Sequence, residues 1–298
     1  MKIRDILARD KRTFSFEFFP PKTPEGEIAL FKTIAELKPL SPSFVSVTYG
    51  ALGNTRGKTF EIVARIKQEY GIEGMAHLTC VASSRAEIRE ILNELKAKGI
   101  ENTLALRGDP PQGTTEFIKP RNGFGYASEL VEEIRGFDYF SIGVAGFPEM
   151  HPQSTNAKSD IFYLKKKVDA GADFVITQLF FDNSLYFKYV ARARAAGVKV
   201  QVIPGIMPIT DFKQLEKFTT MCGASIPARV REDLTPIQDD LDAVYRYGVD
   251  YATRQCQELL DRGAPGLHFY TLNKSRATRL IFRNLRGLSR PSVSQARD

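Results

Sequence analysis

The sequence predicts an α/β protein with the architecture of a (β/α)8 barrel. Eight short apolar runs, rich in β-branched and aromatic residues, alternate with amphipathic stretches along the chain. Gly99, Gly171 and Gly197 stand where three of the amphipathic stretches should end as helices. Strands that alternate with helices form a parallel sheet, and eight such strands can close into a barrel. An open doubly wound sheet is the competing fold, and the lack of a GxGxxG motif after the first strand disfavours it.

The expected elements follow one another in a regular order. A short helix over residues 3–9 comes first. Strands are expected at 14–19, 44–49, 75–81, 102–107, 141–147, 174–180, 200–206 and 267–272. Helices are expected between them, among them 25–38, 84–99 and 157–171, because apolar residues recur there with helical spacing.

Two regions depart from this alternation. Residues 109–126 form a loop rich in Gly and Pro after the fourth strand, long enough to carry function. Residues 223–262 are expected to form an extra helical insertion before the last strand. No linker divides the chain, so residues 1–288 are expected to form one catalytic barrel, followed by a polar, disordered tail at 289–298.

Composition and charge exclude several classes of protein. The 298 residues are 43% apolar and 26% charged, which is typical of a globular protein, and no apolar run is long enough to span a membrane. The net charge is +7, but no basic stripe interleaved with aromatic residues indicates a nucleic-acid partner. Three cysteines, Cys80, Cys222 and Cys256, lie far apart without CxxC spacing, as in a protein of the reducing cytoplasm.

The first strand carries one carboxylate in an aromatic setting. In Phe14-Ser15-Phe16-Glu17-Phe18-Phe19, alternation sends Phe16 and Phe18 to one face and Ser15, Glu17 and Phe19 to the other. A lone glutamate in a buried strand is costly unless it is paired or protonated. From this stretch alone, Glu17 is either a rim residue of an edge strand or an acid with a perturbed pKa.

Polar residues gather at one end of nearly every expected strand, which predicts a ligand site at the carboxyl end of the barrel. They are Glu17, Thr48, Tyr49, His77, Thr79, Arg107, Asp109, Glu149, His151, Gln178, Asp182, Tyr270, Asn273 and Lys274. Arg107 and the lysines 165–167 offer partners for phosphate, although a solvated helix face is the other interpretation of the lysines. Together with Asp160 and Tyr163, which helical spacing places near Lys167, they indicate a nucleotide-like ligand.

Metal and serine-nucleophile chemistry are not indicated. The three histidines are spread over three strands without HxH or HExxH spacing, and His268 is expected near the start of the last strand, away from the site. The GxSxG elbow of serine hydrolases is also missing. No metal is therefore expected.

Ordered blocks along the chain resemble the 5,10-methylenetetrahydrofolate reductase family. They are FSFEFFPPK at 14–22, FVSVTYGA at 44–51, AHLTC at 76–80, LALRGDPP at 104–111, KVDAGADFVITQLFFD at 167–182, IPGIMPI at 203–209 and HFYTLNKS at 268–275. The resemblance implies a (β/α)8 barrel that binds FAD without a covalent bond, in agreement with the strand count.

The resemblance also implies roles for individual residues. Glu17 would be the general acid, with a pKa raised by its aromatic setting, and Asp109 the second catalytic residue, close to both flavin and folate. The implied cofactor-binding residues are Thr48, Tyr49, Ala51, His77, Arg107, Gly108, Asp109, Tyr126, Ala127, Phe147, His151, Asp160, Lys166 and Lys167. The implied substrate-binding residues are Glu17, Gln178, Gln214, Phe218, Tyr270 and Lys274.

The implied reaction is the reduction of 5,10-methylenetetrahydrofolate to 5-methyltetrahydrofolate in the cytoplasm, by a homo-oligomer that alternates between NADH or NADPH and folate. A protein electron donor such as ferredoxin stays open. A flavin-free barrel lyase or methyltransferase and a non-enzymatic binding protein are the rival interpretations. The chain ends soon after the barrel, so the S-adenosylmethionine-binding regulatory domain of eukaryotic members is not expected.

Four residues depart from the family pattern. Phe147 stands in place of Tyr, Tyr163 in place of Asn, and Lys166 in place of Arg. Lys274 stands where many members have Arg, which keeps the charge but loses a planar fork of donors.

Overall fold

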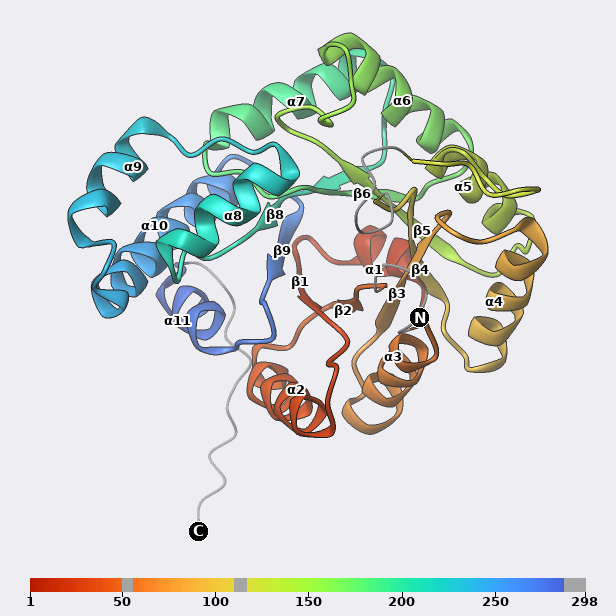
Figure 1. Cartoon of the computed structure of the whole chain (residues 1–298), viewed down its shortest axis with the longest axis horizontal. Coiled ribbons are helices and arrows are strands. Elements are labelled where there is room, and N and C mark those ends of the chain that lie inside the picture. The colour runs from red at the N-terminus through yellow and green to blue at the C-terminus, as the bar shows by residue number, and fades with distance from the viewer. Residues whose placement is uncertain (50–55, 110–116, 287–298) are drawn as a thin grey trace.

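Parallel strands form a ring with helices around its outside in the computed structural model, which describes residues 1–49, 56–109 and 117–286 (Figure 1). The strands are β1 (Thr13–Phe18), β2 (Phe44–Val47), β3 (Gly74–Thr79), β4 (Asn102–Leu106), β5 (Ser141–Gly146), β6 (Phe174–Thr177), β7 (Gln201–Ile203), β8 (Gly205–Ile206) and β9 (Gly266–Tyr270). Their order in the sheet is β7-β6-β5-β4-β3-β2-β1-β9-β8, and neighbouring strands in this order run parallel.

The two ends of this sheet belong to one stretch of chain. Strand β7 pairs with β6, and β8 pairs with β9, while only Pro204 separates β7 from β8. Proline has no N–H to give to a ladder, which interrupts the strand expected at 200–206. The backbone N–H of His268 still donates to the Pro204 carbonyl at 2.9 Å. The ring is thus nearly closed, and the predicted (β/α)8 barrel is confirmed.

The helices other than the first lie on the outside of the ring, with the insertion before the last strand as expected. They are α1 (Ile3–Arg9), α2 (Pro24–Leu37), α3 (Arg56–Tyr70), α4 (Arg85–Ala97), α5 (Ala127–Arg135), α6 (Ala157–Asp169), α7 (Asn183–Ala195), α8 (Phe212–Cys222), α9 (Ala228–Leu234), α10 (Leu241–Asp261) and α11 (Arg276–Asn284), with 3-10 turns at Lys38–Leu40 and Thr235–Ile237. Helices α9 and α10 form the predicted insertion. None of the described helices is long and apolar enough to cross a membrane.

Capping residues explain where several helices begin. Ser84 accepts a hydrogen bond from the Glu87 N–H, and the Glu87 carboxylate accepts one from the Ser84 N–H, which completes a capping box at the start of α4. Thr23 caps α2, where Pro24 occupies the first helical position. Asn156 caps α6 through the Ser159 N–H. These local signals fix the point at which the chain turns from a strand end into the next helix.

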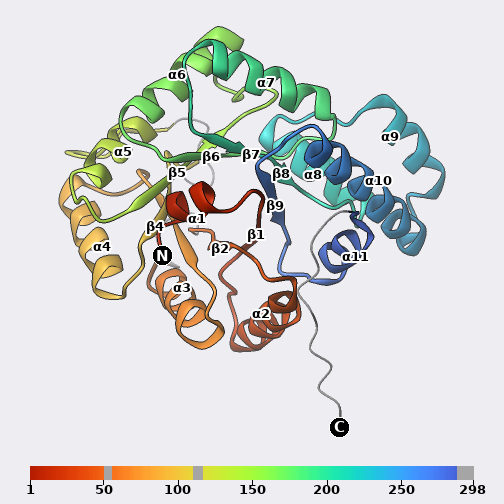
Figure 2. The ribbon, with the colours of Figure 1, turned by 180° about the vertical axis from the view of Figure 1, so that it is seen from behind.

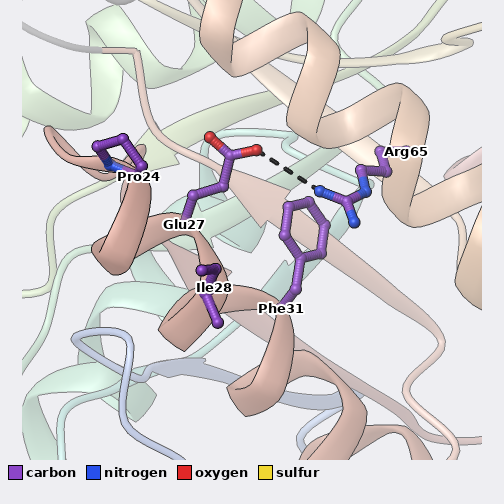
Figure 3. A pocket seen from close by; sticks show the side chains of 5 residues that line it. All are labelled: Pro24, Glu27, Ile28, Phe31 and Arg65. Atoms are coloured by element: carbon purple, nitrogen blue, oxygen red, sulfur yellow. Dashed lines mark ion pairs between the residues drawn. The ribbon is translucent and has the colours of Figure 1, made fainter.

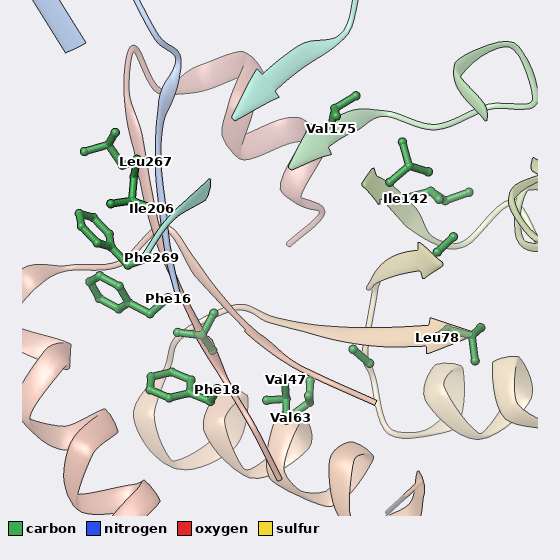
Figure 4. Packing of buried hydrophobic residues seen from close by; sticks show 14 of the residues in the cluster. Phe16, Phe18, Val47, Val63, Leu78, Ile142, Val175, Ile206, Leu267 and Phe269 are labelled. Carbon is green, nitrogen blue, oxygen red and sulfur yellow. The ribbon is translucent and has the colours of Figure 1, made fainter. Parts of the chain in front are cut away.

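The main core lies between the ring of strands and the outer helices. Phe16, Phe18 and Phe269 point outward from β1 and β9 and pack with residues such as Val63 on α3 (Figure 4). Phe16 and Phe18 are fully buried, and burying an aromatic side chain of this size contributes roughly 1.5–3 kcal/mol. Because side chains alternate along a strand, this outer packing forces Ser15 and Glu17 to face the barrel interior.

Helix α1 covers the amino-terminal end of the barrel, as the view from behind shows (Figure 2). Its residues Ile3 and Leu7 pack with the inward-facing Phe44, Met75 and Leu104. The Ile3 N–H also donates to the Asn102 side chain at 2.7 Å. This end of the barrel is therefore filled by apolar side chains, which leaves the opposite end for polar groups. The expected tail at 289–298 lies outside the described residues, and the single-domain prediction for 1–288 stays a prediction.

Candidate active site

A buried group of polar side chains surrounds Glu17 inside the barrel. Strand β1 brings Ser15 and Glu17, β2 brings Ser46, β3 brings His77 and β9 brings His268, and we call these five residues the acid cluster. The sheet register explains the convergence, because Ser15 lies opposite His268 and Glu17 lies opposite Ser46 on neighbouring strands. All five residues are buried.

One oxygen of Glu17 is approached by three other members of the acid cluster. Oε2 lies 3.4 Å from His77 Nε2, 3.3 Å from His268 Nε2 and 3.5 Å from Ser46 Oγ. On the far side of the His268 ring, Nδ1 lies 2.8 Å from Ser15 Oγ. The Glu17 carboxylate is thus paired rather than isolated, which explains how a charged group is tolerated in a buried strand.

The pKa of Glu17 reflects two opposing effects. Burial acts to raise the pKa of the carboxyl, whereas the positive charge of His77 and the hydrogen bonds from His268 and Ser46 act to lower it. Together the neighbours outweigh burial, and the pKa of Glu17 lies below its ordinary value. The expectation of a raised pKa is therefore wrong for this arrangement of side chains. Burial also lowers the pKa of His77, while attraction to Glu17 opposes that change.

His268 lies in the site, and its predicted place away from it is wrong. The strand runs from Gly266 to Tyr270, so His268 is its third residue, whereas it would be the second residue of the strand expected at 267–272. Its ring is fully buried, packs against Phe44 with ring centroids 6.2 Å apart, and meets Tyr270 edge-on at 5.4 Å. Parity along β9 places His268 and Tyr270 on the same face of the strand, toward the barrel interior.

A second group of charged side chains lies at the rim of the barrel. It consists of Arg107, His151, Asp160 and Lys167, and we call it the cationic cluster. Arg107 follows β4, His151 follows β5, and the other two lie on α6. Asp160 accepts hydrogen bonds from the His151 N–H at 3.0 Å and from the Ser154 hydroxyl at 3.1 Å. Arg107 donates to the Gln153 side chain at 2.6 Å. These bonds tie the loop after β5 to the start of α6.

Electrostatics within the cationic cluster favour an anionic ligand. Burial lowers the pKa of the Lys167 amine to about 8, with attraction to Asp160 opposing the change. Burial also lowers the pKa of His151, and the nearby charges of Arg107 and Lys167 lower it further. The Lys167 amine donates to the Ala145 carbonyl at 2.5 Å. The two cations of the cluster, Arg107 and Lys167, outnumber its one carboxylate and leave a net positive charge, which phosphate groups would neutralise.

The three neighbouring lysines of α6 differ in their surroundings. Lys165 forms an ion pair with Asp169 one turn along the helix, and Lys166 is exposed with its amine 5.8 Å from the Phe162 ring centroid. Only Lys167 points toward the strand ends, where its amine contacts Ala145. The solvated-face interpretation therefore fits Lys165, while the expected cofactor contact of the exposed Lys166 stays a prediction.

Aromatic residues flank the cationic cluster. Phe147 meets the His151 ring edge-on, with centroids 4.7 Å apart. Tyr126, at the start of α5, stacks with Tyr163 of α6 at 6.3 Å and an interplanar angle of 11°. Both tyrosines are largely exposed. Tyr163, one of the departures from the family pattern, thus places a second ring beside Tyr126.

The residues expected to bind substrate come from three parts of the barrel. The Tyr270 hydroxyl donates to the Thr177 carbonyl at 2.6 Å, which joins β9 to the end of β6. Gln178 follows β6, and its side-chain oxygen accepts from the Leu179 N–H at 2.9 Å. Gln214 and Phe218 lie one turn apart on α8, and Lys274 is exposed after β9.

The remaining predicted residues lie at the ends of β2 and β4 or at the start of α5. Thr48 and Tyr49 follow β2, Ala127 begins α5, and Asp109 is exposed after Gly108. Gly108 has a φ of +88°, and a Cβ at this position would lie 2.8 Å from the Val81 side chain, so the chain here requires glycine. Ala51 lies outside the described residues.

Two other features of the described residues bear on ligand binding, namely metal-binding side chains and a surface groove. No group of three or more His, Cys, Asp or Glu side chains among the described residues could hold a metal ion. A surface groove between α2 and α3 is lined by Pro24, Glu27, Ile28, Phe31 and Arg65 (Figure 3). Its charges pair with each other, since Arg65 lies 3.5 Å from Glu27, and it is formed by outer helices rather than strand ends.

Comparison with known proteins identifies the family of the chain. The family model described as methylenetetrahydrofolate reductase matches residues 2–286. A 5,10-methylenetetrahydrofolate reductase from Escherichia coli is 41% identical, with 91% of this chain and 90% of the relative covered. The chain belongs to the methylenetetrahydrofolate reductase family.

Other relatives differ in length or in sequence. Methylenetetrahydrofolate reductase (NADH) 1 of Arabidopsis thaliana is 40% identical over 99% of this chain but only 52% of its own length, so the chain spans about half of the plant relative. A solved structure, an uncharacterised Clostridium thermocellum protein that binds two copies of 5-methyl-5,6,7,8-tetrahydrofolic acid, superposes with a TM-score of 0.60. It is 16% identical and covers 95% of this chain and 97% of its own, which shows a shared fold.

Sequence reasoning missed three members of the acid cluster. Ser15, Ser46 and His268 were not among the predicted site residues of this family member, although all three contact Glu17 directly or through one ring. Strand parity was the available signal. Ser15 lies two residues before Glu17, and His268 lies two residues before Tyr270, so each pair shares a face of its strand.

Proposed function

We propose that the protein reduces 5,10-methylenetetrahydrofolate to 5-methyltetrahydrofolate with FAD as cofactor and a reduced nicotinamide as electron donor. The observation that carries this proposal is the position of Glu17. It is a buried acid at the carboxyl end of the barrel, with one histidine from β3, one from β9, and the cationic cluster at the same end. Membership of the reductase family supports the same activity.

The side chains at the rim fit a flavin dinucleotide. Arg107 and Lys167 would hold its pyrophosphate, and Asp160 would accept from a sugar hydroxyl. His77 Nε2 and Thr79 Oγ1 are buried without a hydrogen-bond partner among the described residues, and polar atoms of this kind are expected to pair with a ligand. When bound, FAD supplies hydride transfer between the donor and the folate. The proposed cofactor site is completed by Thr48, Tyr49, Ala51, Gly108, Tyr126, Ala127, Phe147, His151 and Lys166.

Glu17 would protonate folate N5 as the five-membered ring of the substrate opens. Its pKa lies below the ordinary value because neighbouring groups outweigh burial. A bound ring system would exclude water from the carboxyl, and that further loss of solvation raises the pKa of a carboxyl group. Substrate binding would therefore convert Glu17 from a carboxylate that holds its neighbours into an acid able to donate.

Asp109 would act through its charge. It is exposed after β4, and it adjoins the cationic cluster closely enough to influence the pKa of His151. The iminium form of the folate carries a positive charge, and a carboxylate nearby would stabilise it. The space used in turn by folate and nicotinamide would be lined by Gln178, Gln214, Phe218, Tyr270 and Lys274.

The partners of the protein follow from this activity. NADH is the donor in the names of the plant relatives, and the Clostridium thermocellum neighbour binds a methylated folate. The first finding supports a nicotinamide donor for this chain, and the second supports a folate substrate. A cytoplasmic location and a homo-oligomeric state, expected from the sequence, stay predictions.

Product analysis tests the proposal. The purified protein is supplied with FAD, NADH or NADPH, and 5,10-methylenetetrahydrofolate without oxygen, and folates are separated by chromatography. We expect 5-methyltetrahydrofolate to accumulate in proportion to the nicotinamide consumed. Unchanged methylenetetrahydrofolate with both donors would contradict the proposed reaction.

A further inference from the structure

The contacts of Glu17 are unequal on its two oxygens. His77, His268 and Ser46 all approach Oε2, and Oε1 forms no hydrogen bond among the described residues. Three partners on one oxygen fix the plane and direction of the carboxyl group. Oε1 is then the atom that remains for a bound substrate.

The two histidines beside Glu17 are held differently. His268 has a partner on each ring nitrogen, Ser15 Oγ at 2.8 Å and Glu17 Oε2 at 3.3 Å, and its ring is packed against Phe44. His77 Nε2 lies 3.4 Å from the same oxygen but has no hydrogen-bond partner among the described residues. His268 is therefore anchored, whereas His77 has an unused nitrogen.

The hydrogen-bond chain fixes the hydrogens on His268. A carboxylate accepts and does not donate, so the Nε2 of His268 must carry the hydrogen that faces Glu17. In a neutral imidazole the other nitrogen is then an acceptor, and the Ser15 hydroxyl donates to it. Ser15 can donate in this direction because its hydroxyl rotates freely about the C–O bond.

We propose that His268, with its tautomer set by Ser15, is a positioning residue that holds Glu17 Oε2 and turns Oε1 toward the folate. This role rests on the proposed reductase function, because it needs a substrate that receives a proton from Glu17. The histidine does not touch the substrate; it acts through the carboxyl group. Outer partners of this kind orient a functional group and adjust its basicity.

Groups on β2, β3 and β9 affect the charge on Glu17. His77 faces it from β3, Ser46 from β2, and His268 and Tyr270 from β9. Burial acts to raise the pKa of Glu17, and the His268 donor opposes this effect. Removing the donor should therefore raise the pKa of Glu17. The alkaline limb of folate reduction would then move to higher pH while the maximal rate falls, because the acid is no longer correctly oriented.

Nitrogen-15 NMR tests the tautomer without any turnover. The chain has three histidines, so the protein labelled at histidine gives three ring systems, each assigned from a single substitution to Gln. We expect His268 to be protonated on Nε2 and unprotonated on Nδ1 at neutral pH. We expect Ser15→Ala to change the Nδ1 signal. His268 protonated only on Nδ1 would overturn the proposal, since it could not then donate to Glu17.

Kinetics test the positioning role. We expect His268→Gln to lower kcat for folate reduction about 10- to 100-fold, as loss of an outer partner does in other sites, with little change in the KM for folate. Ser15→Ala should lower it about fivefold, since it removes one hydrogen bond worth roughly 1 kcal/mol. Both variants should shift the pH profile to higher pH and keep the nicotinamide half-reaction at the wild-type rate.

A matched control is Ser141→Ala, another buried serine of the barrel, whose hydroxyl accepts from the Arg4 N–H at the opposite end. It should leave the pH profile unchanged. If the wild type is active and the His268 and Ser15 variants keep its pH profile and its rate of folate reduction, the positioning role is overturned. An inactive wild type would instead contradict the proposed function, while the NMR result would still decide the tautomer.

Discussion

The acid cluster and the cationic cluster occupy the same end of the barrel but combine charges in opposite ways. In the acid cluster, two imidazoles and the Ser46 hydroxyl approach one oxygen of a buried carboxylate. In the cationic cluster, one carboxylate lies with the cations Arg107 and Lys167, and its own hydrogen bonds go to the loop after β5. Depth explains the difference, because the first cluster lies inside the ring of strands and the second on its rim.

We propose different functions for the two clusters, although both combine a carboxylate with basic side chains. Inside the ring, the neighbours of Glu17 would control the protonation of the carboxyl group, as proton transfer requires. At the rim, an excess of positive charge would attract a polyanion. The following predictions break or sharpen this division, in order of decreasing effect.

Removing the acid should have the largest effect. We expect Glu17→Gln to lower the rate of folate reduction about 10²- to 10⁴-fold, the usual contribution of a general acid. The nicotinamide half-reaction should proceed at the wild-type rate, because it needs no proton from Glu17. Stopped-flow absorbance of each half-reaction separates the two rates. An equal fall in both would mean that Glu17 maintains the structure of the pocket rather than acting as an acid.

Removing the enclosed lysine should weaken cofactor binding. We expect Lys167→Met to raise the Kd for FAD about 10- to 100-fold, since hydrogen bonds to charged groups contribute roughly 1.5–3 kcal/mol. Lys165→Met is the matched control on the same helix. Its amine pairs with Asp169, so its FAD affinity should stay within about twofold of wild type. Equilibrium dialysis measures both, and equal losses would argue against a specific role for Lys167.

The affinity for FAD should also depend on pH through Lys167. Burial lowers the pKa of this amine to about 8, so its charged form is complete below that pH and is lost above it. A pyrophosphate binds the charged form, and the Kd should therefore rise about tenfold per pH unit above pH 8. Fluorescence titration of FAD between pH 7 and pH 9.5 measures this slope. A slope unchanged in Lys167→Met would assign the titration to another group.

Helix caps give the smallest and most selective contrast. Ser84→Ala and Asn156→Ala each remove a cap and should lower the free energy of unfolding by about 1 kcal/mol, measured by urea denaturation. Only Asn156 caps α6, the helix that carries Asp160 and Lys167. Asn156→Ala should therefore also weaken FAD binding, whereas Ser84→Ala should not. Equal FAD affinity in both variants would show that the Asn156 cap does not affect FAD binding by the cationic cluster.

Local sequence signals predicted most of the fold and only part of the acid cluster. Strand and helix patterns placed the barrel and its insertion, because buried parallel strands and amphipathic helices have distinct periodicities. The division of the seventh strand at Pro204 was not predicted. His268 was assigned to the wrong end of its strand, because β9 begins at Gly266, one residue earlier than its apolar run.

Features that depend on distant contacts were harder to predict. The aromatic neighbours of Glu17 indicated a raised pKa, but Phe16 and Phe18 point away from the carboxyl, and the groups that control it come from β2, β3 and β9. Similarly, three consecutive lysines look alike in the sequence. The turn of α6 decides that Lys167 faces the strand ends while Lys165 pairs along the helix surface.

The most direct test of the central claim is the absorbance spectrum of the protein after incubation with FAD and removal of the unbound cofactor. We predict a two-band flavin spectrum that bleaches when NADH or NADPH is added without oxygen, and that returns when 5,10-methylenetetrahydrofolate follows. A protein that retains no flavin, or a bound flavin that folate does not reoxidise, would contradict the assignment of these two clusters to one reductase site.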